Sequence, residues 1–139
     1  MHLYIEANRL IGDIQNEFNK MFPFLKIEFF KNKSLLRSDF SSNQIIPHNR
    51  KIGEGQLAMK DGEIEIDKEM KVIELEKHFR DQFNLSVQVF RKSGNLWLET
   101  TMTDNWTLQQ QNNHGRELST GENRNPGMND MESNRQTDL

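Results

Sequence analysis

Few residues in this sequence have the types and spacing that chemistry at a site requires. Acidic side chains alternate along one segment, at Glu63, Glu65, Asp67 and Glu69. Such a row could line a strand edge for a hard cation, but no loop with the ligand spacing of a calcium site accompanies it. The four histidines are scattered, and no two of them have the three- or four-residue spacing of a helical metal site. The sequence therefore predicts no metal centre.

Motifs that would supply a nucleophile or bind a phosphate are also absent. The chain has no cysteine, which excludes disulfides, thiolate ligands and cysteine nucleophiles. No Gly-x-Ser-x-Gly elbow occurs, and no Lys-Ser or Lys-Thr follows Gly53-Glu54-Gly55 as in a phosphate-binding loop. Catalysis needs an acid, base or nucleophile held by its neighbours. We therefore expect a non-enzymatic protein with no cofactor and no catalytic residue.

Three short segments, 25–30, 85–92 and 96–99, carry the stronger candidates for a site. Their aliphatic side chains recur at every second position, which is the period of a β-strand. If those side chains face a core, the opposite face carries large aromatic and charged residues. We expect an interaction surface there, made by Phe30, Phe90, Trp97, Lys26, Lys92 and Glu99. The same alternation adds Tyr4, Glu28, Glu65 and Gln88 to this face.

An internal repeat indicates which elements position these residues. Apolar positions of residues 3–31 recur in residues 64–91, first at an offset of 61 and, after one deleted residue, at an offset of 60. The matched pairs are Leu3 with Ile64, Ile5 with Ile66, Ile11 with Val72, Ile14 with Leu75, Phe18 with Phe79, Phe22 with Phe83, Leu25 with Leu85, Ile27 with Val87, Phe29 with Val89 and Phe30 with Phe90.

Each copy has the pattern of a β-α-β unit. Strands are expected at 3–5 and 25–29 in the first copy and at 64–66 and 85–89 in the second. Between them, apolar residues at helical spacing predict helices over 9–22 and 69–83. Pro23 and Asn84 are placed to end these helices. A turn at 91–95 and an alternating run at 96–101 predict a hairpin strand, and Thr103-Asp104-Asn105 could cap a short helix containing Trp106 and Leu108.

Two tandem β-α-β units predict an α+β domain with a ferredoxin-like sheet, over residues 1–108 with a link at 32–62. The alternative is that the two units do not share one sheet and pair through a partner chain. In either case we expect Leu25, Ile27, Phe29, Leu85, Val87, Val89, Leu96 and Leu98 to face the helices.

The end of the chain differs in composition. Hydrophobic residues make up 34% of the whole chain, but residues 109–139 contain only four, Leu118, Met128, Met131 and Leu139. We therefore expect a polar, disordered tail over 109–139. No apolar run reaches the roughly 18 residues that span a membrane, and no signal peptide is recognisable. Together with the lack of cysteine, this predicts a cytoplasmic protein with no membrane partner.

The strings VQVFRKSGNLWLETT at residues 87–101 and TDNWTL at residues 103–108 resemble a small family of bacterial α/β proteins. The resemblance extends loosely over residues 1–112. It implies no activity, ligand or site residue, and adds only the expectation of a bacterial cytoplasmic protein.

The sequence allows three interpretations of the predicted interaction surface. Trp106 and Leu108, or the segment 35–46, could cover it within the chain. It could bind a protein, most simply a second copy, since aromatic residues are enriched at interfaces. Nucleic acid is disfavoured, because the net charge is −3 and Glu28, Glu65 and Glu99 share the face. We predict a self-associating protein-interaction module, with a small-metabolite-binding regulatory domain and then a single-stranded RNA binder as the alternatives.

Overall fold

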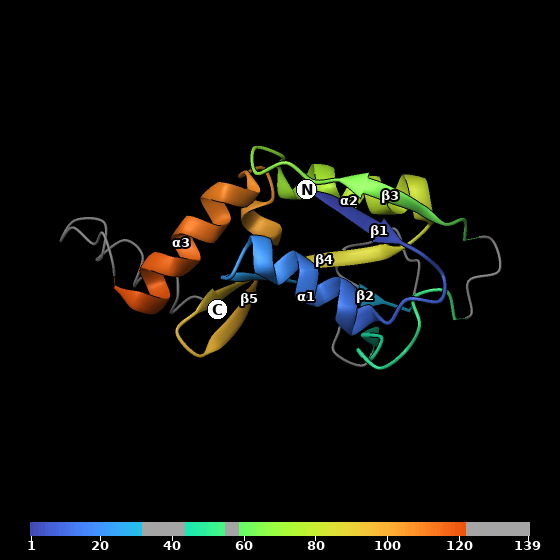
Figure 1. Ribbon diagram of the computed structural model, residues 1–139. Coiled ribbons are helices and arrows are strands. Elements are labelled where there is room, and N and C mark those ends of the chain that lie inside the picture. Colours follow the sequence, from blue (N-terminus) through green and yellow to red (C-terminus); the bar gives the residue numbers. More distant parts are fainter. Residues whose placement is uncertain (32–43, 55–58, 122–139) are drawn as a thin grey trace.

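The computed structural model describes residues 1–31, 44–54 and 59–121, and it is an α+β structure, as the sequence predicts (Figure 1). Its elements, in chain order, are β1 (His2–Ile5), α1 (Ile11–Met21), β2 (Leu25–Phe30), β3 (Gly62–Glu65), α2 (Val72–Phe83), β4 (Ser86–Ser93), β5 (Leu96–Glu99), a 3₁₀ turn (Thr101–Thr103) and α3 (Leu108–Thr120). In the part of the chain so described, no helix is both long enough and apolar enough to cross a membrane.

The sheet topology corrects one expectation. The described strands form two antiparallel sheets, β1-β3 and β2-β4-β5, instead of one continuous ferredoxin-like sheet. In the first sheet β1 pairs with β3, and in the second β2 pairs with β4, so each sheet joins a strand of residues 3–31 to a strand of residues 64–91. Leu3 lies opposite Ile64, and Glu28 lies opposite Gln88. The segments 3–31 and 64–91 thus contact each other through both sheets within the chain.

The core lies between the two sheets and the helices α1 and α2. Phe18 and Phe79 are fully buried, and Phe22 and Phe83 are 3% and 5% exposed, so their predicted burial is confirmed. The ring centroids of Phe18 and Phe22 are 5.3 Å apart and those of Phe79 and Phe83 are 6.2 Å apart, with the same interplanar angle of 49°. The strand residues Leu25, Ile27, Phe29, Val87 and Val89 also belong to this core, as does Leu85 directly before β4.

Later parts of the chain pack against the N-termini of α1 and α2 and accept hydrogen bonds from their first N–H groups. We call these parts, residues 44–54 at α1 and residues 104–108 at α2, the returning segments. The first N–H groups of a helix lack partners within the helix. In α1 the N–H of Ile11 donates to the carbonyl of Arg50 (2.9 Å), and in α2 the N–H of Val72 donates to the carbonyl of Trp106 (3.1 Å). One residue further along each helix, the N–H of Gly12 donates to the carbonyl of His48 and the N–H of Ile73 donates to the carbonyl of Asp104, both at 2.9 Å.

The returning segments also pair with the residues that precede the helices. The N–H of Ile52 donates to the carbonyl of Arg9, and the N–H of Leu108 donates to the carbonyl of Met70, both at 2.8 Å. Ile52 and Leu108 are buried at 2% and 0% exposure. The residues 44–54, part of the expected link, are therefore packed onto the body of the protein.

Helix α3 corrects the expected boundary at residue 108. The prediction of a disordered tail beginning at Gln109 is wrong for residues 109–120, which form most of α3. Thr107 caps the helix by accepting a hydrogen bond from the N–H of Gln110, and the helix buries Gln111, His114 and Gly115. Polar side chains are buried here because they form hydrogen bonds, a pattern that apolar periodicity does not detect. The rest of the predicted tail, 122–139, lies outside the described residues.

The hairpin strand is present but shorter than expected, over Leu96–Glu99. Its turn places Gly94 at a φ of +61°, a conformation that favours glycine. The register places Leu96 on the same face as Leu98 and Arg91, but Leu96 is 64% exposed and so does not join the core as expected. It lies directly after the turn, at the outer end of β5, where the hairpin projects from the body near α3 (Figure 1).

Candidate functional site

Five of the six predicted interaction residues lie together on one face of the β2-β4-β5 sheet. The strand registers place Lys26 opposite Phe90 and Phe90 opposite Glu99. The adjacent row places Lys92 opposite Trp97. We refer to Lys26, Phe90, Lys92, Trp97 and Glu99 as the aromatic face. Each of them is at least partly accessible, and Glu99 is exposed.

Cationic side chains cover the aromatic rings of this face. The ammonium of Lys26 lies 5.5 Å from the centroid of Phe90 and 5.1 Å from that of Trp97. The ammonium of Lys92 lies 5.9 Å from the centroid of Trp97. Lys26 is further held by an ion pair with Glu28 at 3.1 Å. Cation–π contacts of this kind stabilise partly exposed lysines by roughly 0.5–1 kcal/mol, so the lysines are positioned over the rings.

Phe30, the sixth predicted residue, belongs to a closed end of the same face. It is 4% exposed and forms an isolated antiparallel bridge with Ile45. Gln88, two residues along the face from Phe90, is fully buried as well. The accessible part of the face is therefore confined to the end nearest the β4–β5 turn. Of the segment 35–46 that we considered as a cover, Leu35, Leu36 and Phe40 lie outside the described residues.

Trp106 does not cover the aromatic face. Its ring lies 6.0 Å from the guanidinium carbon of Arg91 and 5.3 Å from the ring of His114 on α3. Arg91 alternates with Phe90 and Lys92 along β4, so its side chain points to the other face of the sheet. The Nη1 of Arg91 also donates to the Oε1 of Gln111 at 3.0 Å. Trp106 thus helps dock α3 on the opposite side.

A groove of about 390 Å³ borders the aromatic face along α1. It is lined by Gly12, Gln15, Asn16, Asn19, Lys26, Glu28, His48 and Trp97. Two of the amides are engaged at the edge of β2: Gln15 Nε2 donates to the Ile27 carbonyl (2.7 Å), and Asn19 Nδ2 donates to the Leu25 carbonyl (2.9 Å). The sequence gives little sign of this groove, because its residues come from four separate segments.

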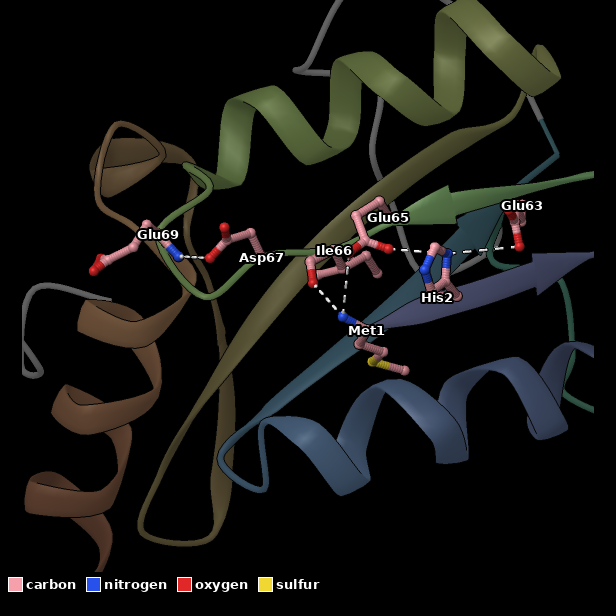
Figure 2. Close-up of polar contacts among 7 residues, drawn as sticks. All are labelled: Met1, His2, Glu63, Glu65, Ile66, Asp67 and Glu69. Atoms are coloured by element: carbon pink, nitrogen blue, oxygen red, sulfur yellow. Dashed lines mark hydrogen bonds and ion pairs between the residues drawn. The ribbon is translucent and has the colours of Figure 1, made fainter.

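The alternating acids are used in contacts within the protein. Figure 2 shows the His2 ring between Glu63 and Glu65, with Nδ1 at 3.6 Å and 2.9 Å from their carboxylates. The terminal amine of Met1 donates to the Ile66 carbonyl at 3.0 Å (Figure 2). Asp67 accepts from the N–H of Glu69 at 2.9 Å (Figure 2). Across residues 1–31, 44–54 and 59–121, no three acidic or histidine side chains are arranged to hold a metal ion.

Two hydrophobic residues next to or within the β5 strand are exposed, which the sequence analysis does not predict. Leu96 was assigned to the core side of β5, and Met102 is 93% exposed in the 3₁₀ turn that follows this strand. The sequence does indicate the exposure of Leu96, because this residue directly follows the turn residues Gly94 and Asn95, where a strand end projects from the sheet.

Comparisons with known proteins give no relative for this chain: no family model, no curated protein and no solved structure matches it.

Proposed function

We propose that this protein is a non-enzymatic interaction module that associates with a second copy of itself through the aromatic face. The observation that carries the proposal is the accessible cluster of two aromatic rings and two lysines next to Glu99 on one sheet face. Exposed apolar patches rimmed by charge mark interaction sites.

A second copy fits this face better than a polyanion does. Lys26 and Lys92 supply positive charge, whereas Glu28 and Glu99 supply negative charge on the same face. A two-fold axis places one patch next to its own equivalent, so that residues of opposite charge can meet twice. A nucleic acid would be attracted by the lysines and repelled by the carboxylates.

The experiment is a mass measurement by light scattering on the full chain over a range of concentrations. Trp97→Glu removes the indole and places a further carboxylate on the aromatic face, and we expect it to abolish association. Tyr4→Glu is the matched control, because Tyr4 is an aromatic strand residue that is 53% exposed and lies in the separate β1-β3 sheet, away from this face. Circular dichroism checks that both variants are folded. A wild-type chain that stays monomeric, or equal effects of the two variants, would contradict the proposal.

The groove beside α1 favours a second candidate, a small-metabolite-binding regulatory domain. Its volume of about 390 Å³ falls within the range of small-molecule sites. Its amides, carboxylate and indole suit a polar ligand with a flat face. A thermal-shift screen against nucleotides, amino acids and metal ions separates the two candidates, because a large specific shift with a small ligand would favour the metabolite.

The tandem β-α-β organisation is part of the same proposal. Leu3 with Ile64 and Glu28 with Gln88 are pairs at the repeat offsets of 61 and 60, and each pair lies directly opposite in its sheet. The equivalent closure of the two helix N-termini supports a duplicated unit that includes the returning segment. In this interpretation the chain resembles a two-fold dimer of β-α-β units fused into one. The proposal places this protein in the cytoplasm, with which a cysteine-free chain is compatible.

A further inference from the structure

The two outer edges of the three-stranded sheet differ in how their backbone groups are used. At the β2 edge, the carbonyls of Leu25, Ile27 and Phe29 accept hydrogen bonds from Asn19, Gln15 and the N–H of Ile46. These bonds, 2.7 to 2.9 Å long, close that edge to a further strand. Natural sheets protect their edges in this way, because an open edge pairs with other chains.

Among the described residues, no further strand pairs with the opposite edge, which is formed by β5. The N–H of Lys92 donates to the Phe24 carbonyl, so the backbone of Lys92 faces β2. Backbone groups alternate in direction along an antiparallel strand, and therefore Arg91 and Ser93 face β5. Their partners Leu98 and Leu96 face back toward β4, which leaves the backbone groups of Trp97 and Glu99 pointing outward. Within the described residues, neither of these two backbones has a hydrogen-bond partner.

We propose that β5 pairs antiparallel with β5 of a second copy, joining the two three-stranded sheets edge to edge. This inference rests on the proposed self-association and specifies how the two copies meet. An antiparallel strand edge is self-complementary under a two-fold axis. With the axis at Leu98, the outward backbone groups of Trp97 in one copy and Glu99 in the other exchange hydrogen bonds.

Charge complementarity selects a second copy as the occupant of this edge. The axis at Leu98 places Glu99 of the second copy beside Trp97, at the usual strand separation of about 4.8 Å. Both Lys26 and Lys92 hold their ammonium groups within 5.9 Å of the Trp97 ring. The carboxylate of one copy therefore approaches the lysines of the other, and the symmetry repeats this contact. A strand from an unrelated protein would satisfy the backbone without supplying this acid.

An intermolecular charge exchange tests the pairing on the full-length chain. Lys92→Glu alone and Glu99→Lys alone each place like charges across the axis, and we expect each to raise the dimer dissociation constant at least tenfold. A mixture of the two variants restores opposite charges at both contacts, so it should form a heterodimer of near wild-type affinity. Restoration in the mixture cannot come from contacts within one chain. Sedimentation equilibrium measures all three dissociation constants.

A second variant tests the backbone directly. Glu99→Pro removes the outward N–H and leaves the β4–β5 ladder untouched, whereas Glu99→Ala removes only the charge. We expect the proline variant to weaken dimerisation at least tenfold more than the alanine variant, with unchanged circular dichroism. If the wild type is monomeric, both this inference and the proposed function fail. If the wild type dimerises but the mixed variants do not recover and proline acts like alanine, the edge pairing alone is overturned.

Discussion

Phe18 and Phe79 are the residues on which the packing of the two helices depends most. Both are fully buried at matching positions, and the Phe79 ring also meets Phe29 edge to face with centroids 5.7 Å apart. Phe79→Ala would leave a cavity under α2, and Phe18→Ala would leave one under α1. We expect each to lower the free energy of unfolding by about 3–5 kcal/mol. Urea denaturation measures this, with the exposed Tyr4→Ala as the control expected to change little.

Glu54 gives a residue-scale prediction that depends on pH. Its carboxylate accepts a hydrogen bond from the N–H of Lys51 at 2.9 Å, which lowers the pKa of Glu54, and Arg50 lowers this pKa further. A lowered pKa means a contribution to stability that is present above the unfolded-state pKa and is lost as the pH falls through the folded-state pKa. An NMR titration should find the pKa of Glu54 below that of an ordinary glutamate. In Arg50→Ala it should stay low, because the backbone bond is the larger cause.

At the scale of elements, α3 depends on a close approach at Gly115. A Cβ at this position would lie 2.9 Å from Phe24 Cβ, 3.1 Å from Arg91 Cγ and 3.2 Å from the Lys92 carbonyl. Alanine normally stabilises a helix interior by about 1 kcal/mol relative to glycine. We expect Gly115→Ala to reverse that sign and destabilise the protein by roughly 1–3 kcal/mol through overpacking.

The control for this prediction is Asn113→Ala, a substitution on the same helix at a partly exposed residue. It should leave the unfolding temperature unchanged or raise it slightly, since alanine has the higher helix propensity. A Gly115→Ala protein that is as stable as the Asn113→Ala protein would show that α3 does not dock as closely as described.

The elements differ in how well the sequence predicts them. Helices α1 and α2 were predictable because Phe18, Phe22, Phe79 and Phe83 repeat at helical spacing. Only a short helix containing Trp106 and Leu108 was predicted in place of α3, because the buried residues of α3 include Gln111, which accepts from Arg91 and donates to Thr103. The division into two sheets was not predictable either, since alternation shows which face a residue takes and not which strand lies beside it.

The candidate site shows the same limit. Alternation brought Lys26, Phe90, Lys92, Trp97 and Glu99 onto one face, and the strand registers place them as neighbours. Phe30 follows the same alternation but is buried, because the returning segment bridges it at Ile45. The open edge of β5 requires knowledge of the strand order, which no single-strand pattern contains.

At the level of the whole molecule, the proposed duplication predicts matching local stability in the segments 3–54 and 64–108. The N–H groups of Ile11 and Val72 donate to returning segments in the same way, and those of Ile52 and Leu108 reciprocate. We expect these four amides to exchange slowly and to similar extents, because each bond closes a helix N-terminus against buried apolar residues. Native-state hydrogen exchange by NMR measures this. Fast exchange at Ile11 and Ile52 together with slow exchange at Val72 and Leu108 would argue against equivalent units.

Sedimentation equilibrium of the unmodified chain is the decisive test of self-association. The chain mass is 16.4 kDa, so a reversible dimer is recognised by an apparent mass that rises with concentration toward twice this value. We predict that rise, together with its loss in Trp97→Glu and its retention in Tyr4→Glu. An apparent mass that stays at 16.4 kDa at the highest attainable concentration would contradict the proposed self-association.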